Sequence, residues 1–337
     1  QDTSYPAAEH LAPPDKIRVR LRETGYVRHE LLGLNAFLLQ MFNQFNDILG
    51  VRKNDYMSGS KTALADTIDN VSRQAQTKTA TIEIPSVSIS NGVLSADVKV
   101  TNLTGHRFPS GVGFRRAFLE FQVIENRDGR EQVVWASGRT NRVGVIIDGE
   151  GKTLPSEFFN EYREGKQLRQ HFQPHHEKIT SQSQVQIYEE LVQDAKGRFS
   201  TSFIHRGTEV KDNRLLPKGW TKKGPDPSIP SAFVEATHPH GNAAADPQYQ
   251  DGSGTDVVKY EINLPAAQNP ANLSVQATLF YQSIPPFYLN MRFRTAPRGE
   301  ATRRLYYMAS NLVTEGTPVE AWKLRLVSAR APAKGNR

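Results

Sequence analysis

The pattern of hydrophobic and polar positions changes its period along the chain. Between about residues 17 and 49, apolar residues recur at spacings of three and four, which predicts an amphipathic helix, and residues 58–77 show a second stretch of this kind. We expect the two stretches to form an antiparallel helical hairpin. From Thr81 onward the period is two, most clearly over residues 94–100, which predicts antiparallel strands with one buried face.

Further alternating stretches extend the predicted sheet, with Asn91-Gly92 and Asp128-Gly129 as turn signals. The predicted strands cover residues 81–84, 94–100, 116–125, 132–136, 184–192, 199–204, 256–264, 272–282 and 319–328. The stretches 148–182, 206–255 and 284–304 are rich in Pro, Gly, Asn and charge, which predicts long irregular loops. The fold class is therefore mainly β: an N-terminal helical hairpin, then an antiparallel β-sandwich with long loop insertions.

Three regions follow from this pattern. Residues 1–78 hold the irregular lead-in and the helical hairpin, residues 79–330 the β-sandwich domain, and residues 331–337 a tail. No apolar run approaches the 18 or so residues of a transmembrane helix, so no transmembrane segment is expected.

Composition narrows the chemistry. The 337 residues include no cysteine, which excludes disulfides, zinc–thiolate sites, cysteine nucleophiles, iron–sulfur clusters and covalent attachment of haem c by this chain itself. The net charge of +7 is mild and its basic residues are scattered, so nucleic acid is not an expected partner. No nucleophile elbow or Gly-rich phosphate loop is present, and no catalytic residue is assigned.

The most distinctive string is Asn102-Leu103-Thr104-Gly105-His106-Arg107-Phe108-Pro109, at the end of a predicted strand. Gly105 lets the backbone turn and Pro109 stiffens the exit, so we expect His106 at a strand corner. An imidazole presented there can bind a metal ion or a haem iron. The alternative is a surface or capping histidine.

Three more strings follow in order: residues 175–189, 211–220 and 279–284. Together with the string around His106 they resemble the C-terminal, β-rich half of the periplasmic multihaem cytochrome c family. Residues 28–37 resemble the segment at the haem-domain boundary of that family, and the resemblance covers roughly residues 26–285. The haem-attachment motifs are missing, however.

The missing motifs leave three alternatives open: a fragment of a longer cytochrome, a separate subunit that packs on a haem-bearing partner, or a relative that has lost haem. The irregular start at Gln1 favours a fragment or a subunit. The resemblance then implies a non-catalytic electron-transfer component that is not an enzyme by itself. It would dock on a multihaem cytochrome c chain, within a larger assembly, in the bacterial periplasm or outside the cell after signal removal.

The resemblance also implies how this chain would serve a partner's haem c. A histidine from this chain would fill the sixth position of the iron, and neighbouring arginines would pair with haem propionates. The candidates are His106, His29, Arg107, Arg115, Arg116 and Arg28. The alternative for His29 is a histidine on the polar face of a helix.

Two weaker metal candidates come from the residues alone. The doublet His175-His176 follows a proline in a predicted loop and offers one ligand and one supporting donor, although such a doublet is more often simply solvated. The stretch from Asp246 to Asp256 offers carboxylate oxygens for calcium without the regular spacing of a calcium loop. Two other functions remain open: a β-sandwich module that binds a carbohydrate or protein, and a histidine-based metalloenzyme.

Overall fold

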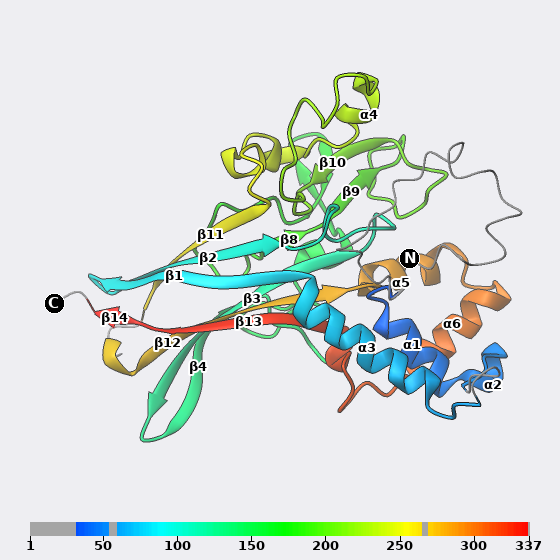
Figure 1. Ribbon diagram of the computed structural model, residues 1–337, viewed down its shortest axis with the longest axis horizontal. Helices are drawn as coiled ribbons and strands as arrows, with labels where there is room; N and C mark the ends of the chain where they lie inside the picture. The colour runs from blue at the N-terminus through cyan, green and yellow to red at the C-terminus, as the bar shows by residue number, and fades with distance from the viewer. Residues whose placement is uncertain (1–31, 54–58, 265–268, 336–337) are drawn as a thin grey trace, which may run out of the picture. The chain divides into compact units, whose positions relative to one another are not determined.

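The computed structural model describes residues 32–53, 59–264 and 269–335. The chain divides into two compact units, residues 1–33 and 34–337, and every helix and strand below lies in the second. Two β-sheets form the framework of that unit, and Figure 1 shows several of its helices gathered at one end of the sheets. The fold class predicted from the sequence, mainly β with a few helices, is confirmed.

The first sheet is built on a long hairpin that turns at Asn91-Gly92, where both residues have positive φ. Its strands are, in order, β14 (Lys334–Gly335), β1 (Ala80–Ser90), β2 (Val93–Asn102), β11 (Thr255–Asn263) and β7 (Lys178–Ile179). Each edge strand is parallel to its neighbour, β14 to β1 and β7 to β11, whereas β1, β2 and β11 pair antiparallel.

The second sheet centres on β3, whose hairpin to β4 turns at Asp128-Gly129 as expected. Its strands are, in order, β13 (Leu324–Pro332), β12 (Leu273–Gln282), β3 (Arg116–Arg127) and β4 (Arg130–Ser137), and β8 (Ile187–Tyr188) also pairs with β3. Two short hairpins stand apart: β9 (Glu190–Gln193) with β10 (Thr208–Asp212), and β5 (Glu161–Glu164) with β6 (Gln167–Gln170).

The core lies where the two sheets face each other. Phe121 on β3 stacks on Tyr260 on β11 with ring centroids 3.9 Å apart, and both side chains are fully buried. The alternation along the strands predicted this interior, because every second side chain of a strand points to the same face. The buried apolar residues of the central strands are Leu94, Ala96, Val98, Val100, Leu119, Phe121, Val123, Val258, Tyr260, Ile262, Val275, Ala277 and Leu279.

The helices form near the predicted places at the N-terminal side. The helices of the unit are α1 (Ala36–Gln44), α2 (Asn46–Leu49), α3 (Ala63–Lys78), α4 (Ser231–Glu235), α5 (Pro286–Thr295) and α6 (Glu300–Ser310). Asn35 caps α1 by accepting a hydrogen bond from the Leu38 N–H at 3.2 Å. The helix predicted over 17–49 breaks at Phe45, and its part before residue 32 lies outside the described residues.

The structure corrects several predictions. The stretches 148–182 and 206–255, predicted as irregular, contain the β5–β6 hairpin with β7, and β10 with α4, respectively. The stretch 284–304, predicted as irregular, contains α5 and the first part of α6; Pro286 stands at the first position of α5, where a missing N–H costs nothing. Residues 199–204 form a loop rather than a strand, with one bridge from Phe199 to Gln193. Strand β13 begins only at Leu324, because Ala321 and Trp322 adopt left-handed backbone angles in a short 3-10 turn.

Candidate functional site

His106 lies on an exposed loop that directly follows β2, as the sequence predicted. Its Nδ1 is 2.9 Å from the backbone carbonyl oxygen of Arg107. A carbonyl oxygen only accepts, so Nδ1 carries the ring proton and donates it. The lone pair of the neutral imidazole is therefore on Nε2, which makes no hydrogen bond within the part of the chain that the structure describes.

The side chain of Asn102 shapes the loop that carries His106. Its amide nitrogen donates to the His106 carbonyl oxygen at 2.8 Å and to the carbonyl oxygens of Leu215 and Leu216 at 3.1 Å each. Its oxygen accepts from the backbone N–H of Thr104 at 2.8 Å. Asn102 is buried, so these bonds tie the loop firmly to the segment after β10.

An apolar cleft of ≈ 530 Å³ lies next to the loop that carries His106. Gly105 forms part of its wall, and the opposite side comes from the loop after β10 and from α4. Its lining includes Pro217, Lys218, Trp220, Pro225, Ile229 and Phe233. Phe233 is 69% exposed, so a large apolar side chain faces solvent at the cleft. The volume lies in the usual range for ligand-binding clefts.

Three of the four arginines predicted to pair with propionates are engaged within the chain. Arg107 forms an ion pair with Asp212 and donates to the Ala236 carbonyl oxygen at 2.9 Å. Arg115 donates to the Ser110 carbonyl oxygen at 3.1 Å.

Arg116 is buried, with 2% of its surface exposed, and its guanidinium donates to both carboxylate oxygens of Glu157 at 2.7 and 2.9 Å. Its Nε donates to Gln282 at 2.8 Å. Burial alone would lower the pKa of Arg116, but the charge and hydrogen bonds of Glu157 raise it overall. The Arg116 guanidinium is thus charged and part of the protein interior.

His29 and Arg28 lie outside the described residues. His176 is nearly buried, and its Nε2 donates to the Gln173 side-chain oxygen at 2.9 Å. Burial, together with the nearby Lys211 and His175, lowers the pKa of His176 to about 4. His176 is therefore neutral and internally bonded rather than solvated.

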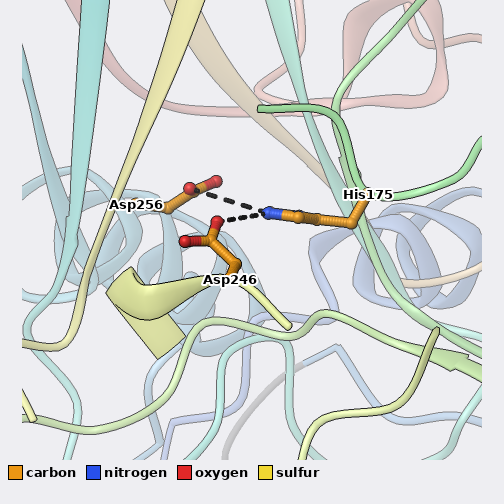
Figure 2. Close-up of side chains that lie close together, drawn as sticks. All are labelled: His175, Asp246 and Asp256. Carbon is orange, nitrogen blue, oxygen red and sulfur yellow. Dashed lines mark hydrogen bonds and ion pairs between the residues drawn. The ribbon is translucent and has the colours of Figure 1, made fainter. Parts of the chain in front are cut away.

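His175 lies in a buried cluster with Asp246 and Asp256, shown in Figure 2. Its Nε2 is 2.9 Å from Asp246 Oδ2 and 4.0 Å from Asp256 Oδ1, and the three side chains are at most 1% exposed. The loop before β7, the 3-10 turn Pro247–Tyr249 with its capping Asp246, and the start of β11 bring them together. Two separate sequence candidates, the histidine doublet and the Asp246–Asp256 stretch, thus meet at one place.

Sequence reasoning missed a charged cluster on the β9–β10 hairpin. Arg206 donates to Glu190 at 2.5 Å and also bonds Glu209, and Arg214 donates to Asp212 at 2.6 Å. Burial would raise the pKa of Glu190, but the hydrogen bond from Arg206 helps to lower it to about 2. Because charges are matched here, the cluster is explained as an ion-pair network that holds the hairpin together.

Comparisons with known proteins find one similar solved structure. No protein-family model matches this chain, and no curated protein matches it. A penta-haem cytochrome c552 from Thermochromatium tepidum is similar over 77% of this chain and 41% of its own, with 14% sequence identity and a TM-score of 0.38. The chain thus spans about two fifths of the length of that structure. No helix in the described ranges combines the length and the apolar character needed to cross a membrane.

Proposed function

We propose that this chain is a non-catalytic electron-transfer component that docks on a haem-bearing c-type cytochrome chain and supplies His106 as a distal ligand to a haem iron. The observation that carries the proposal is the state of His106: an exposed imidazole whose Nδ1–H is bonded to a backbone carbonyl and whose Nε2 lone pair is free. The location that goes with this function, the periplasm or the cell exterior, is part of the proposal.

The hydrogen bond on Nδ1 suits an axial ligand. Metal-binding histidines almost always donate their other ring N–H to a carbonyl or carboxylate, which fixes the tautomer and makes the ligating nitrogen more basic. In His106 this second bond is already in place in the free chain, because the Arg107 carbonyl oxygen accepts it at 2.9 Å. These 337 residues include no cysteine, so a c-type haem would be attached by a separate chain or by another part of a longer cytochrome.

The cleft beside His106 supports the same reading. A haem bound at Nε2 presents a flat apolar ring, and the Trp220, Ile229 and Phe233 side chains offer apolar surface for it. Lys218 also lines the cleft and is exposed, so its ammonium group can form an ion pair with a carboxylate of the partner. Lysines rather than arginines would pair with the haem propionates, because Arg107, Arg115 and Arg116 are engaged within the chain.

A spectroscopic titration tests the proposal without knowledge of the partner. The probe is a short haem c peptide that contains Cys-x-x-Cys-His and leaves the sixth position of its ferric iron open to water. Addition of this chain should shift the Soret band to the low-spin, two-histidine form. His106→Ala should weaken this shift at least tenfold, whereas His205→Ala, which removes another exposed histidine, should leave it unchanged. Equal titrations of the two variants would refute the assignment of His106.

One other function has an observation in its favour. The cleft with Trp220 and the exposed Phe233 is also what a module that binds a carbohydrate or peptide would use. Trp220→Ala separates the two functions, because it would abolish carbohydrate or peptide binding, whereas the haem peptide would bind more weakly but still give the low-spin spectrum that reports ligation by His106. The metalloenzyme alternative has no such support: the cluster of His175, Asp246 and Asp256 is closed to substrate by its burial.

A further inference from the structure

The cluster of His175, Asp246 and Asp256 holds two carboxylates deep inside the chain. Asp246 accepts from the His175 ring at 2.9 Å and from the Gln248 backbone N–H at 2.8 Å. Within the described residues, no lysine or arginine bonds to either carboxylate. Buried carboxylates normally have a cationic partner, because transfer of an unpaired negative charge out of water is very costly.

Asp256 shows where the missing positive charge belongs. Its Oδ2 accepts hydrogen bonds from the Gln186 amide at 2.9 Å and from the Tyr188 hydroxyl at 2.8 Å. Its Oδ1 is fully buried and has no hydrogen-bond partner, and it faces Asp246 and His175 across the cluster. Buried polar atoms without a partner are rare in folded proteins, and one that points into a set of ligand atoms indicates an absent ligand.

The hydrogen bonds of His175 assign its ring proton. The side-chain amides of Gln186 and Asn213 donate to Nδ1 at 2.9 and 3.3 Å, and each amide is oriented by a backbone N–H that its oxygen accepts. The proton of neutral His175 is therefore on Nε2, where it points at Asp246. The ring cannot supply the missing charge by a second proton on Nδ1, because that proton would meet two N–H donors.

We propose that one divalent cation binds between Asp256 Oδ1 and Asp246 Oδ2, with His175 positioning Asp246 through its Nε2–H. The three ligand-type atoms lie within 4.8 Å of one another, close enough for one ion to contact two or all of them. A hard ion such as Ca²⁺ needs only the oxygens and leaves the His175 proton in place. Ligation of Zn²⁺ or Mn²⁺ by Nε2 would require the ring proton to move to Nδ1, where the side-chain amides of Gln186 and Asn213 would have to turn their oxygens toward it, so the geometry favours binding by the oxygens alone.

The competing occupant is a proton on Asp256. Burial raises the pKa of this carboxyl group, so in the absence of metal the proton is the natural way to neutralise it. A bound divalent cation would take the place of that proton and neutralise both carboxylates, so the two occupants are told apart by direct measurement of metal binding.

The test uses the whole chain stripped with a chelator and titrated separately with Ca²⁺, Mn²⁺ and Zn²⁺. We expect one ion per chain and a roughly hundredfold rise in the folding equilibrium constant at metal concentrations 100 times Kd. Tb³⁺ in place of Ca²⁺ should luminesce on excitation of the buried Tyr188 and Tyr249 nearby. The ¹⁵N chemical shift of His175 Nε2 separates oxygen-only binding, which leaves it protonated, from ligation by the ring.

Asp256→Asn is the decisive variant, because its side chain has the shape of the protonated acid and should fold normally. It should lose metal binding at least tenfold, whereas Asp251→Asn, at an exposed position in the loop just before β11, should bind as the unmodified chain does. If none of the three ions binds, or if Asp256→Asn binds them as well as Asp251→Asn does, the cation site does not exist.

Discussion

The buried pair of Arg116 and Glu157 allows a quantitative prediction. Glu157→Gln keeps the shape of the side chain but removes its charge, which leaves the Arg116 guanidinium buried and uncompensated. Loss of one partner of such a pair costs about 3–5 kcal/mol. Here the upper half of that range is expected, because Glu157 Oε2 also accepts the Ile146 backbone N–H at 2.9 Å and the pair is only 2% exposed.

Urea unfolding at pH 7 measures this loss as a lower midpoint at unchanged slope. The matched control is Glu164→Gln, which breaks an ion pair with Arg169 whose side chains are more than half exposed and should cost at most about 0.5 kcal/mol. The double variant Arg116→Met with Glu157→Leu should recover only part of the stability, since an apolar pair removes the uncompensated charge but leaves the Ile146 N–H and the Gln282 side-chain oxygen without these partners. A loss below about 1 kcal/mol for Glu157→Gln would show that Glu157 is not the group that compensates the buried charge of Arg116.

Two further predictions concern stability. Folding lowers the pKa of His176 from 6.5 to about 4, so between these values the unfolded chain binds a proton that the folded chain does not. The free energy of unfolding should therefore drop by roughly 3 kcal/mol as pH falls from 7 to 4. Urea unfolding at the two pH values measures this drop, and His176→Gln should remove most of it. Gly138 and Gly129 both have positive φ, but a Cβ on Gly138 would overlap the Leu119 carbonyl oxygen whereas one on Gly129 meets nothing. Gly138→Ala should therefore destabilise by more than about 2 kcal/mol and Gly129→Ala by about 1 kcal/mol, and equal losses in thermal unfolding would argue against this packing.

The sheets could be predicted because alternation is a local signal. Residues 94–100 and 116–125 alternate clearly, and the structure places them in β2 and β3. The signal fails where an element is polar on most sides: α5 carries Arg292 and Arg294 and begins with a proline, so its helical period is hidden by charge. The proline pair at 285–286 is a usable signal in retrospect, since proline favours the first turn of a helix.

The candidate sites were only partly predictable. The sequence places His106 on an exposed loop, but the Nδ1–H bond to a carbonyl oxygen that frees Nε2 depends on the loop geometry. Arg116 sits at a strand start where the sequence does not show which face it takes, and the fold turns it inward to Glu157, 41 positions away. The cluster of His175 and Asp246 joins residues 71 positions apart, which only tertiary structure brings together.

The most direct test of the proposed function asks whether a nitrogen of this chain binds the iron. Chain labelled with ¹⁵N-histidine is mixed with the unlabelled haem c peptide, and electron–nuclear double resonance of the ferric complex records the couplings of the axial nitrogens. The proposal predicts one ¹⁵N coupling that is present with the unmodified chain and with His205→Ala but absent with His106→Ala. A complex that shows only ¹⁴N couplings, or a ¹⁵N coupling that survives in His106→Ala, would contradict it.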